Sequence, residues 1–170
     1  MTAADEVFGR SPSASTDDVA RLAGVGIATV FRHFPTKIEL LEAVLALRLE
    51  RLRDRALELA ASDDPGTAFF GFFTQVVSES ASKLAIGEAL MASGAAIGAD
   101  THKAGQGLRE AFDGLLTRAQ QSGAVRTDAK FPEVYALLIG ASRGATAAGL
   151  EPDVRDRMLA LIYDGLKPRS

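Results

Sequence analysis

Residues 15–37, STDDVARLAGVGIATVFRHFPTK, contain two short helical patterns separated by a glycine turn. Ser15 precedes the first pattern, where its hydroxyl can accept a hydrogen bond from the backbone of Asp18. Gly24 stands where that helix would end in a left-handed conformation. Pro35 ends the second pattern, because the residue before a proline is pushed out of helical geometry. Two short helices joined by such a turn predict a helix-turn-helix, whose second helix can enter the major groove of DNA.

The longer run DDVARLAGVGIATVFRHFPTKIELLEAVL, residues 17–45, resembles the DNA-binding segment of the tetracycline-repressor (TetR) family of one-component transcriptional regulators. The resemblance extends over an acidic pair, an AGV turn, a recognition helix of the form T-V-F-x-H-F, the sequence P-T-K and a helix containing two consecutive leucines. It implies an all-α fold of about nine helices. In such a fold an N-terminal helix-turn-helix domain binds DNA, and a C-terminal helical domain binds a ligand and dimerises.

The resemblance, carried over position by position, assigns DNA contacts to eight residues: Thr16, Ile27, Ala28, Thr29, Phe31, Arg32, His33 and Lys37. Thr29 and His33 fall on phosphate-contacting positions, and Phe31 on the position that meets the thymine methyl group. Arg32 is the only long hydrogen-bond donor on the expected recognition helix, and it can read a guanine or meet a phosphate. Considered singly, His33 could be an ordinary surface histidine and Phe31 a core aromatic residue.

Composition limits the other classes of function. The chain has 170 residues and a net charge of −3, so DNA binding must come from a local cluster rather than a general positive field. It has no cysteine, which excludes disulfides and thiolate metal sites. No catalytic or phosphate-binding motif is present, and Gly24-x-Gly26 is not a dinucleotide fingerprint. We expect no enzyme activity, no cofactor and no metal site.

Helical patterns continue through the rest of the chain. Apolar residues recur at steps of three and four, and Gly, Pro and Ser-Asp clusters separate the segments. Besides the two helices of the helix-turn-helix, the patterns predict helices over residues 2–8, 36–61, 67–85, 87–96, 103–122, 131–148 and 152–164.

A cluster of phenylalanines marks the helix predicted over residues 67–85. Four of the nine Phe residues lie between positions 69 and 73. They can form a core, or part of the cluster can line a pocket for a small, mostly apolar effector. On the second interpretation, the candidate ligand-binding residues are Phe69, Phe73, Gln75, Val76, Met91 and Phe112.

The last two predicted helices carry more apolar and small side chains than a monomer of this size needs. They would pair with their copies as a four-helix bundle, and the resemblance implies the same homodimer. We therefore expect a DNA-binding domain over residues 1–45 and a ligand-binding and dimerisation domain over residues 46–170. No signal peptide or membrane span is predicted, which favours a cytoplasmic protein.

The predicted function is that of a regulator, in the first instance a repressor, which binds a palindromic double-stranded DNA operator as a dimer and is released by the effector. One departure from the family keeps a second interpretation open. The first helix, over residues 2–8, is about half as long as is usual in the family. The alternative is therefore a dimeric small-molecule-binding protein whose DNA binding is weakened or lost.

Overall fold

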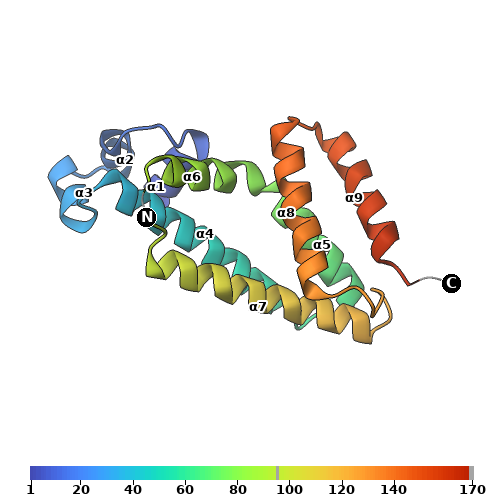
Figure 1. The fold of residues 1–170 in the computed structure, drawn as a ribbon. Coiled ribbons are helices and arrows are strands. Elements are labelled where there is room, and N and C mark those ends of the chain that lie inside the picture. The colour runs from blue at the N-terminus through green and yellow to red at the C-terminus, as the bar shows by residue number, and fades with distance from the viewer. Residues whose placement is uncertain (95, 169–170) are drawn as a thin grey trace. The chain divides into compact units, whose positions relative to one another are not determined.

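The computed structural model of the chain describes residues 1–94 and 96–168, which contain nine α-helices and no strand (Figure 1). The helices are α1 (Thr2–Arg10), α2 (Thr16–Ala23), α3 (Ile27–His33), α4 (Lys37–Leu59), α5 (Pro65–Ser78), α6 (Ser80–Ala92), α7 (Ala99–Gln121), α8 (Phe131–Ala147) and α9 (Pro152–Leu166). The predicted all-α fold is confirmed. Within the described residues, no helix is both long and apolar enough to cross a membrane.

The chain divides into two compact units. Unit 1 consists of Met1–Arg51 and Ser82–Gln106, and unit 2 consists of Leu52–Ala81 with the described residues from Gly107 on. The predicted division at residue 45 follows the sequence alone, whereas the structure adds most of α6 and the start of α7 to the N-terminal unit. Helices α4, α6 and α7 each belong to both units.

The core of unit 1 holds the helix-turn-helix against α1, α4 and α6. Phe8 of α1 and Val44 of α4 are fully buried in it. Helix α6 contributes two further buried side chains, Ile86 and Leu90. Because these residues lie far from the helix-turn-helix in sequence, its support depends on a segment that local patterns do not link to it.

A buried ion pair fixes the short helix α1 to α4. The Asp5 carboxylate accepts hydrogen bonds from Arg48 Nε and Arg51 Nη1, both at 2.5 Å, and Arg48 Nη2 donates to the Asp5 carbonyl at 2.8 Å. Burial raises the pKa of Asp5, but the hydrogen bonds and charges of Arg48 and Arg51 outweigh it, so the pKa lies below the ordinary 3.8. The pair stabilises the folded state while Asp5 is ionised.

Replacing Asp5 by asparagine is expected to lower the free energy of unfolding at neutral pH by about 2 kcal/mol, because Arg48 loses its charged partner. The native pKa is depressed, so this contribution is complete above about pH 4 and disappears as the pH falls through the native pKa. Urea unfolding of both proteins at pH 7 and pH 3 measures it. The exposed Glu6–Arg10 pair gives the control, Glu6→Gln, with a change of about 0.5 kcal/mol or less. An equal difference at both pH values would contradict the assignment.

Helix α7 begins four residues before the predicted start. The Glu42 carboxylate, from α4, accepts a hydrogen bond from the Gly98 N–H at 2.8 Å, and Thr101 Oγ1 donates to the Glu42 carbonyl at 3.3 Å. A side chain from α4 thus caps the helix. The prediction of Lys103 as the first residue was wrong because this partner lies 56 residues away in the sequence.

The helix predicted over residues 67–85 is also divided differently. Helix α5 ends at Ser78, and α6 starts at Ser80 after a single intervening residue, Glu79. The second predicted helix, 87–96, is therefore the latter part of α6, which ends at Ala92. Ala95 lies outside the described residues. Ser80 Oγ donates to the Val77 carbonyl at 2.7 Å, which satisfies a backbone group at the end of α5.

Unit 2 is built around the aromatic cluster. Phe69, Phe72, Phe73 and Phe112 are all fully or almost fully buried. The rings of Phe69 and Phe112 stack with centroids 5.6 Å apart, and the Phe72 ring also lies 5.6 Å from Phe112. This packing joins α5 to α7. The interpretation of the cluster as a core is confirmed for these residues.

Candidate nucleic-acid interface

The turn before the recognition helix has the geometry that the sequence predicts. Ser15 Oγ accepts a hydrogen bond from Asp18 N at 3.1 Å, and Asp18 Oδ2 accepts one from Ser15 N at 2.9 Å. These hydrogen bonds from Ser15 hold the pKa of Asp18 below its usual value. Gly24 ends α2 with φ of 67°, a left-handed conformation that glycine adopts at little cost. The turn therefore places α3 directly after α2.

Helix α3 presents most of its side chains to solvent. Only Val30 is buried, and the neighbouring Phe34 is half-buried. The six candidates on this helix are all exposed: Ile27, Ala28, Thr29, Phe31, Arg32 and His33. Phe31 is therefore not a core residue, which excludes one of the two interpretations of that position. The arrangement leaves an apolar and hydroxyl-bearing surface with one guanidinium, which suits methyl contacts in a major groove.

Two other DNA candidates and one core candidate differ from the prediction in their surroundings. Thr16 is only 7 % exposed, so its side chain packs within unit 1 rather than standing out toward solvent. Lys37 Nζ donates to the Ser13 carbonyl at 3.0 Å and lies 5.8 Å from the Phe8 ring centre. Leu22, expected to pack with Val19, is exposed. Lys37 therefore already has a partner in the loop before α2, which sequence spacing could not reveal.

Most cations in residues 1–51 are already paired within the unit. Arg10 pairs with Glu6, Arg21 with Asp17 and Asp18, and Arg48 and Arg51 with Asp5. Arg32 is the one arginine of this segment for which the structure gives no carboxylate or carbonyl partner. Its guanidinium is exposed on the recognition helix. Arg32 is consequently the cation best placed to meet DNA.

The ligand candidates do not form one site. Phe69, Phe73 and Phe112 lie in the packed core of unit 2, and Val76 is buried beside them. Gln75 Nε2 donates to Glu79 Oε1 at 3.1 Å. Met91 belongs to unit 1, where it is 71 % exposed. The structure thus separates Met91 from the other five, because the chain leaves unit 2 near the start of α6.

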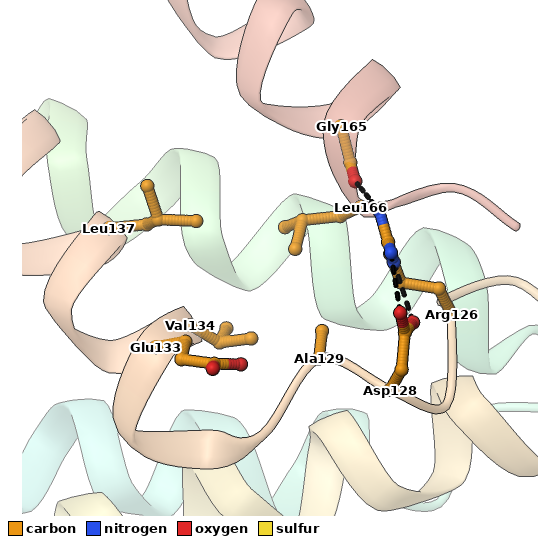
Figure 2. Close-up of a pocket in the computed structure, with 8 residues that line it drawn as sticks. All are labelled: Arg126, Asp128, Ala129, Glu133, Val134, Leu137, Gly165 and Leu166. Atoms are coloured by element: carbon orange, nitrogen blue, oxygen red, sulfur yellow. Dashed lines mark hydrogen bonds and ion pairs between the residues drawn. The ribbon is translucent and has the colours of Figure 1, made fainter. Parts of the chain in front are cut away.

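Unit 2 contains two cavities that none of these candidates except their neighbour Val77 approaches. The larger, of about 280 Å³, lies between the loop before α8, the first turns of α8 and the end of α9. Figure 2 shows Val134, Leu137 and Leu166 on its apolar side, with Arg126 and Asp128 on its polar side. The smaller, of about 190 Å³, lies where α5, α6, α8 and α9 begin or end. Sequence reasoning missed both, because each is assembled from the ends of helices rather than from one apolar stripe.

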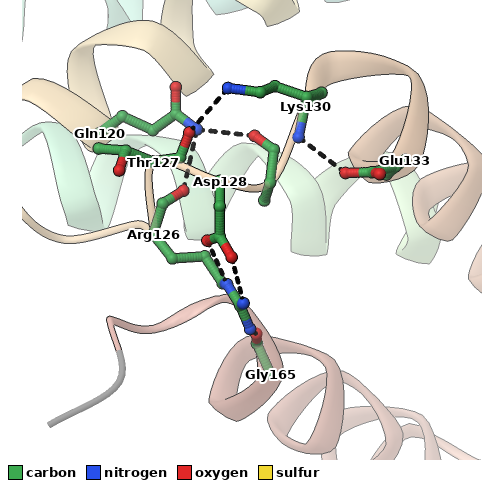
Figure 3. Close-up of polar contacts among 8 residues, drawn as sticks. Gln120, Arg126, Thr127, Asp128, Lys130, Glu133 and Gly165 are labelled. Carbon is green, nitrogen blue, oxygen red and sulfur yellow. Dashed lines mark hydrogen bonds and ion pairs between the residues drawn. The ribbon is translucent and has the colours of Figure 1, made fainter.

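A hydrogen-bonded corner beside the larger cavity holds the end of α9 (Figure 3). Arg126 donates to both carboxylate oxygens of Asp128, at 2.6 and 2.5 Å, and its backbone N–H donates to the Leu166 carbonyl at 2.9 Å. Gln120 Nε2 donates to the carbonyls of Arg126 and Ala129, at 2.9 and 2.8 Å. The corner ties α9 to α7 and to the loop that precedes α8.

Replacing Gln120 by methionine is expected to lower the free energy of unfolding by about 1–2 kcal/mol, because two partly buried carbonyl groups lose their donor. Thermal or urea unfolding measures this change. Gln121→Met is the matched control, since the adjacent glutamine is exposed and should change little. Equal effects of the two substitutions would show that the Gln120 amide does not organise the corner.

Helices α8 and α9 keep an exposed apolar surface. Leu137 and Ile139 on α8 and Val154 on α9 are exposed, and Leu161 on α9 is 76 % exposed. Small residues accompany them on α8, among them Gly140 and Gly144. The predicted stripe on α9 was partly wrong, because Leu159 and Leu166 are its buried residues and Leu161 points to solvent. The surface matches in kind what a helix-pair interface requires.

Comparisons with known proteins agree with this architecture. The model of bacterial regulatory proteins of the tetR family matches residues 1–44, and that of the C-terminal domain of SbtR-like transcriptional regulators matches residues 64–168. A comparison with curated proteins gives no match.

Solved structures are similar along nearly the whole chain. A TetR regulatory protein from Mycobacterium vanbaalenii is 32 % identical, with a TM-score of 0.78 over 98 % of this chain and 92 % of that one. The TetR transcriptional regulator SCO0520 from Streptomyces coelicolor is 30 % identical, with a TM-score of 0.78 over 99 % and 97 % of the two chains. The ketosteroid transcriptional regulator KstR2 of Mycobacterium tuberculosis shares the fold, at 17 % identity and a TM-score of 0.67 over 99 % and 93 %.

Family members are DNA-binding regulators rather than enzymes, and they bind operators and small molecules, typically as homodimers. The two family models together match most of the sequence, from the helix-turn-helix to the end of α9. The chain belongs to the TetR family of transcriptional regulators.

Proposed function

We propose that the protein is a repressor that binds a palindromic operator as a homodimer and is released by a small effector with a largely apolar body. The observation that carries the proposal is the exposed face of α3, on which Ile27, Thr29 and Phe31 surround the unpaired Arg32. Such a face offers methyl and hydroxyl contacts together with one guanidinium for a guanine or a phosphate.

The exposed apolar surface of α8 and α9 supports dimerisation. A two-fold dimer through that surface would present two copies of α3 to DNA. The two helices would meet successive major-groove faces when they stand about 34–36 Å apart, and the operator would then be palindromic. One helix-turn-helix alone makes few contacts, so the second copy is needed for tight binding.

Effector release requires a link between the units. Helix α4 has 23 residues, or about 35 Å, and belongs to unit 1 at its start and to unit 2 at its end. An effector that binds one spacing of the two recognition helices more tightly would shift the dimer toward that spacing. A difference of a few kcal/mol between the two states is sufficient.

Binding to a duplex from the upstream region of its own gene tests the function. We expect the affinity to exceed that for a scrambled duplex by at least about 10³-fold, and to fall with rising salt as counterions are released. Equal affinities for the two duplexes would overturn the repressor assignment. They would favour instead a dimeric small-molecule-binding protein that no longer recognises DNA.

A further inference from the structure

The smaller cavity of unit 2 combines hydroxyl groups, a guanidinium and apolar side chains. It has a volume of about 190 Å³ and lies beside Ser80, the first residue of α6. Thr146 lines it from α8, and Arg155 from the first turn of α9. Val77, Ala145 and Leu150 supply the apolar part of the wall. The cavity therefore offers polar recognition next to a small apolar surface.

The Ser80 hydroxyl is buried in the wall of this cavity, since the residue is only 3 % exposed. Its oxygen lies 2.7 Å from the Val77 carbonyl, 3.2 Å from Thr146 Oγ1 and 3.3 Å from the Ser142 carbonyl. A hydroxyl has one proton, and the shortest contact places it on Val77. Thr146 can then donate its own proton to Ser80 or to another acceptor in the cavity.

A second buried hydroxyl lies close by. Ser142 is 4 % exposed, and its Oγ has no hydrogen-bond partner within the part of the chain that the structure describes. It precedes Thr146 by one helical turn and so shares a face of α8 with it. A buried hydroxyl without a partner is costly, which makes the polar group missing from this corner worth identifying.

Arg155 gives the cavity its charge. Its side chain is mostly buried, and its Nε and Nη2 contact the neighbouring Asp156 Oδ1 at 3.3 and 3.2 Å. These are long contacts for a guanidinium and a carboxylate, which pair best at about 2.7–2.9 Å in a two-bonded arrangement. A better placed carboxylate can therefore compete with Asp156.

We propose that this cavity binds a small aliphatic carboxylate, recognised by Arg155 and Thr146 and packed against Val77, Ala145 and Leu150. The inference deepens the proposed function, on which it rests for the regulatory role of the ligand. Ser80 starts α6, and the same helix carries Ile86 and Leu90 into the core of unit 1. A carboxylate that accepts the Thr146 proton removes a hydrogen bond at the start of α6, and that change is how the ligand acts on the DNA-binding unit.

Titration of the full-length protein with butyrate tests the site, with the amide signals of Thr146 and Arg155 followed by NMR. We expect saturable shifts with butyrate and none with butan-1-ol or n-butylamine at equal concentration, because only the anion pairs with Arg155. Arg155→Gln should raise the butyrate Kd by at least about 10-fold, and Thr146→Val by a few-fold. Arg157→Gln is the matched control, since that exposed arginine pairs with Asp153 at 3.0 Å and should leave the Kd unchanged.

The outcomes separate this inference from the proposed function. Absence of saturable shifts, equal shifts with all three probes, or an unchanged Kd in Arg155→Gln would each overturn the carboxylate site. None of these results would affect operator binding, which is measured without butyrate. Butyrate binding by a protein that does not distinguish its upstream duplex from a scrambled one would overturn the repressor assignment and support the site. If both hold, saturating butyrate should change operator affinity in the wild type and not in Arg155→Gln, and no change in the wild type would overturn the coupling.

Discussion

Replacing Arg32 by alanine should weaken binding to the operator by about 1–3 kcal/mol, roughly 5- to 150-fold. Arg32 is exposed on α3, and it is the arginine of residues 1–51 that no carboxylate or carbonyl of the unit engages. Its loss removes charge and hydrogen-bond donors directly from the DNA-reading surface. Fluorescence anisotropy with a labelled operator duplex measures the effect.

Arg21→Ala is the matched control for this experiment. Arg21 is also an exposed arginine of the helix-turn-helix, but Asp17 and Asp18 neutralise it, so we expect a smaller loss of affinity. The salt dependence then distinguishes the two roles of Arg32. A phosphate contact would lower the salt slope by about 1 and weaken all duplexes alike, whereas a guanine contact would also relax sequence preference at one position. Wild-type affinity in Arg32→Ala would contradict the proposed interface.

Replacing Leu161 by glutamate should separate the dimer into monomers. Leu161 is 76 % exposed on α9, within the surface proposed to pair with its copy. In a two-fold interface each copy contributes the same residue, so one substitution introduces two like charges. We expect the dimer to weaken by at least about 2 kcal/mol, or roughly 30-fold, as for other interface residues of large effect. Operator affinity should fall with it, because the two half-sites are no longer bound together.

Sedimentation at micromolar concentration measures the change in oligomeric state. Leu57→Glu provides the control: Leu57 is 55 % exposed in unit 2 but lies on α4, outside the α8 and α9 surface. It should leave the dimer intact. A dimer of unchanged strength in Leu161→Glu, or equal dissociation of both variants, would place the interface elsewhere.

The helix-turn-helix could be predicted because its determinants are local. Ser15 caps the helix that follows it within three residues, and Gly24 and Pro35 mark helix ends on their own. The exposure of Ile27, Thr29 and Arg32 follows from the same helical spacing that buries Val30. Short-range rules were sufficient for the surface that we propose to meet DNA.

Features that depend on distant partners could not be predicted. Glu42 caps α7 from across 56 positions, and Lys37 donates to a carbonyl 24 residues earlier. Composition alone does not show that Ile86 and Leu90 complete the core of unit 1. The two cavities arise for the same reason, since each brings helix ends together that no sequence pattern relates. The candidate ligand residues were chosen from one apolar helix, and most of them proved to be core.

Selection of bound sequences from a pool of random duplexes tests the central claim most directly, because it requires no knowledge of the operator. The account predicts one enriched palindrome whose two half-sites have their centres about 10–10.5 base pairs, or a multiple of one helical turn, apart. The same selection with Arg32→Ala should enrich this palindrome less or not at all. Failure of the wild-type protein to enrich any sequence, or enrichment of a single site without two-fold symmetry, would contradict a dimeric operator-binding regulator.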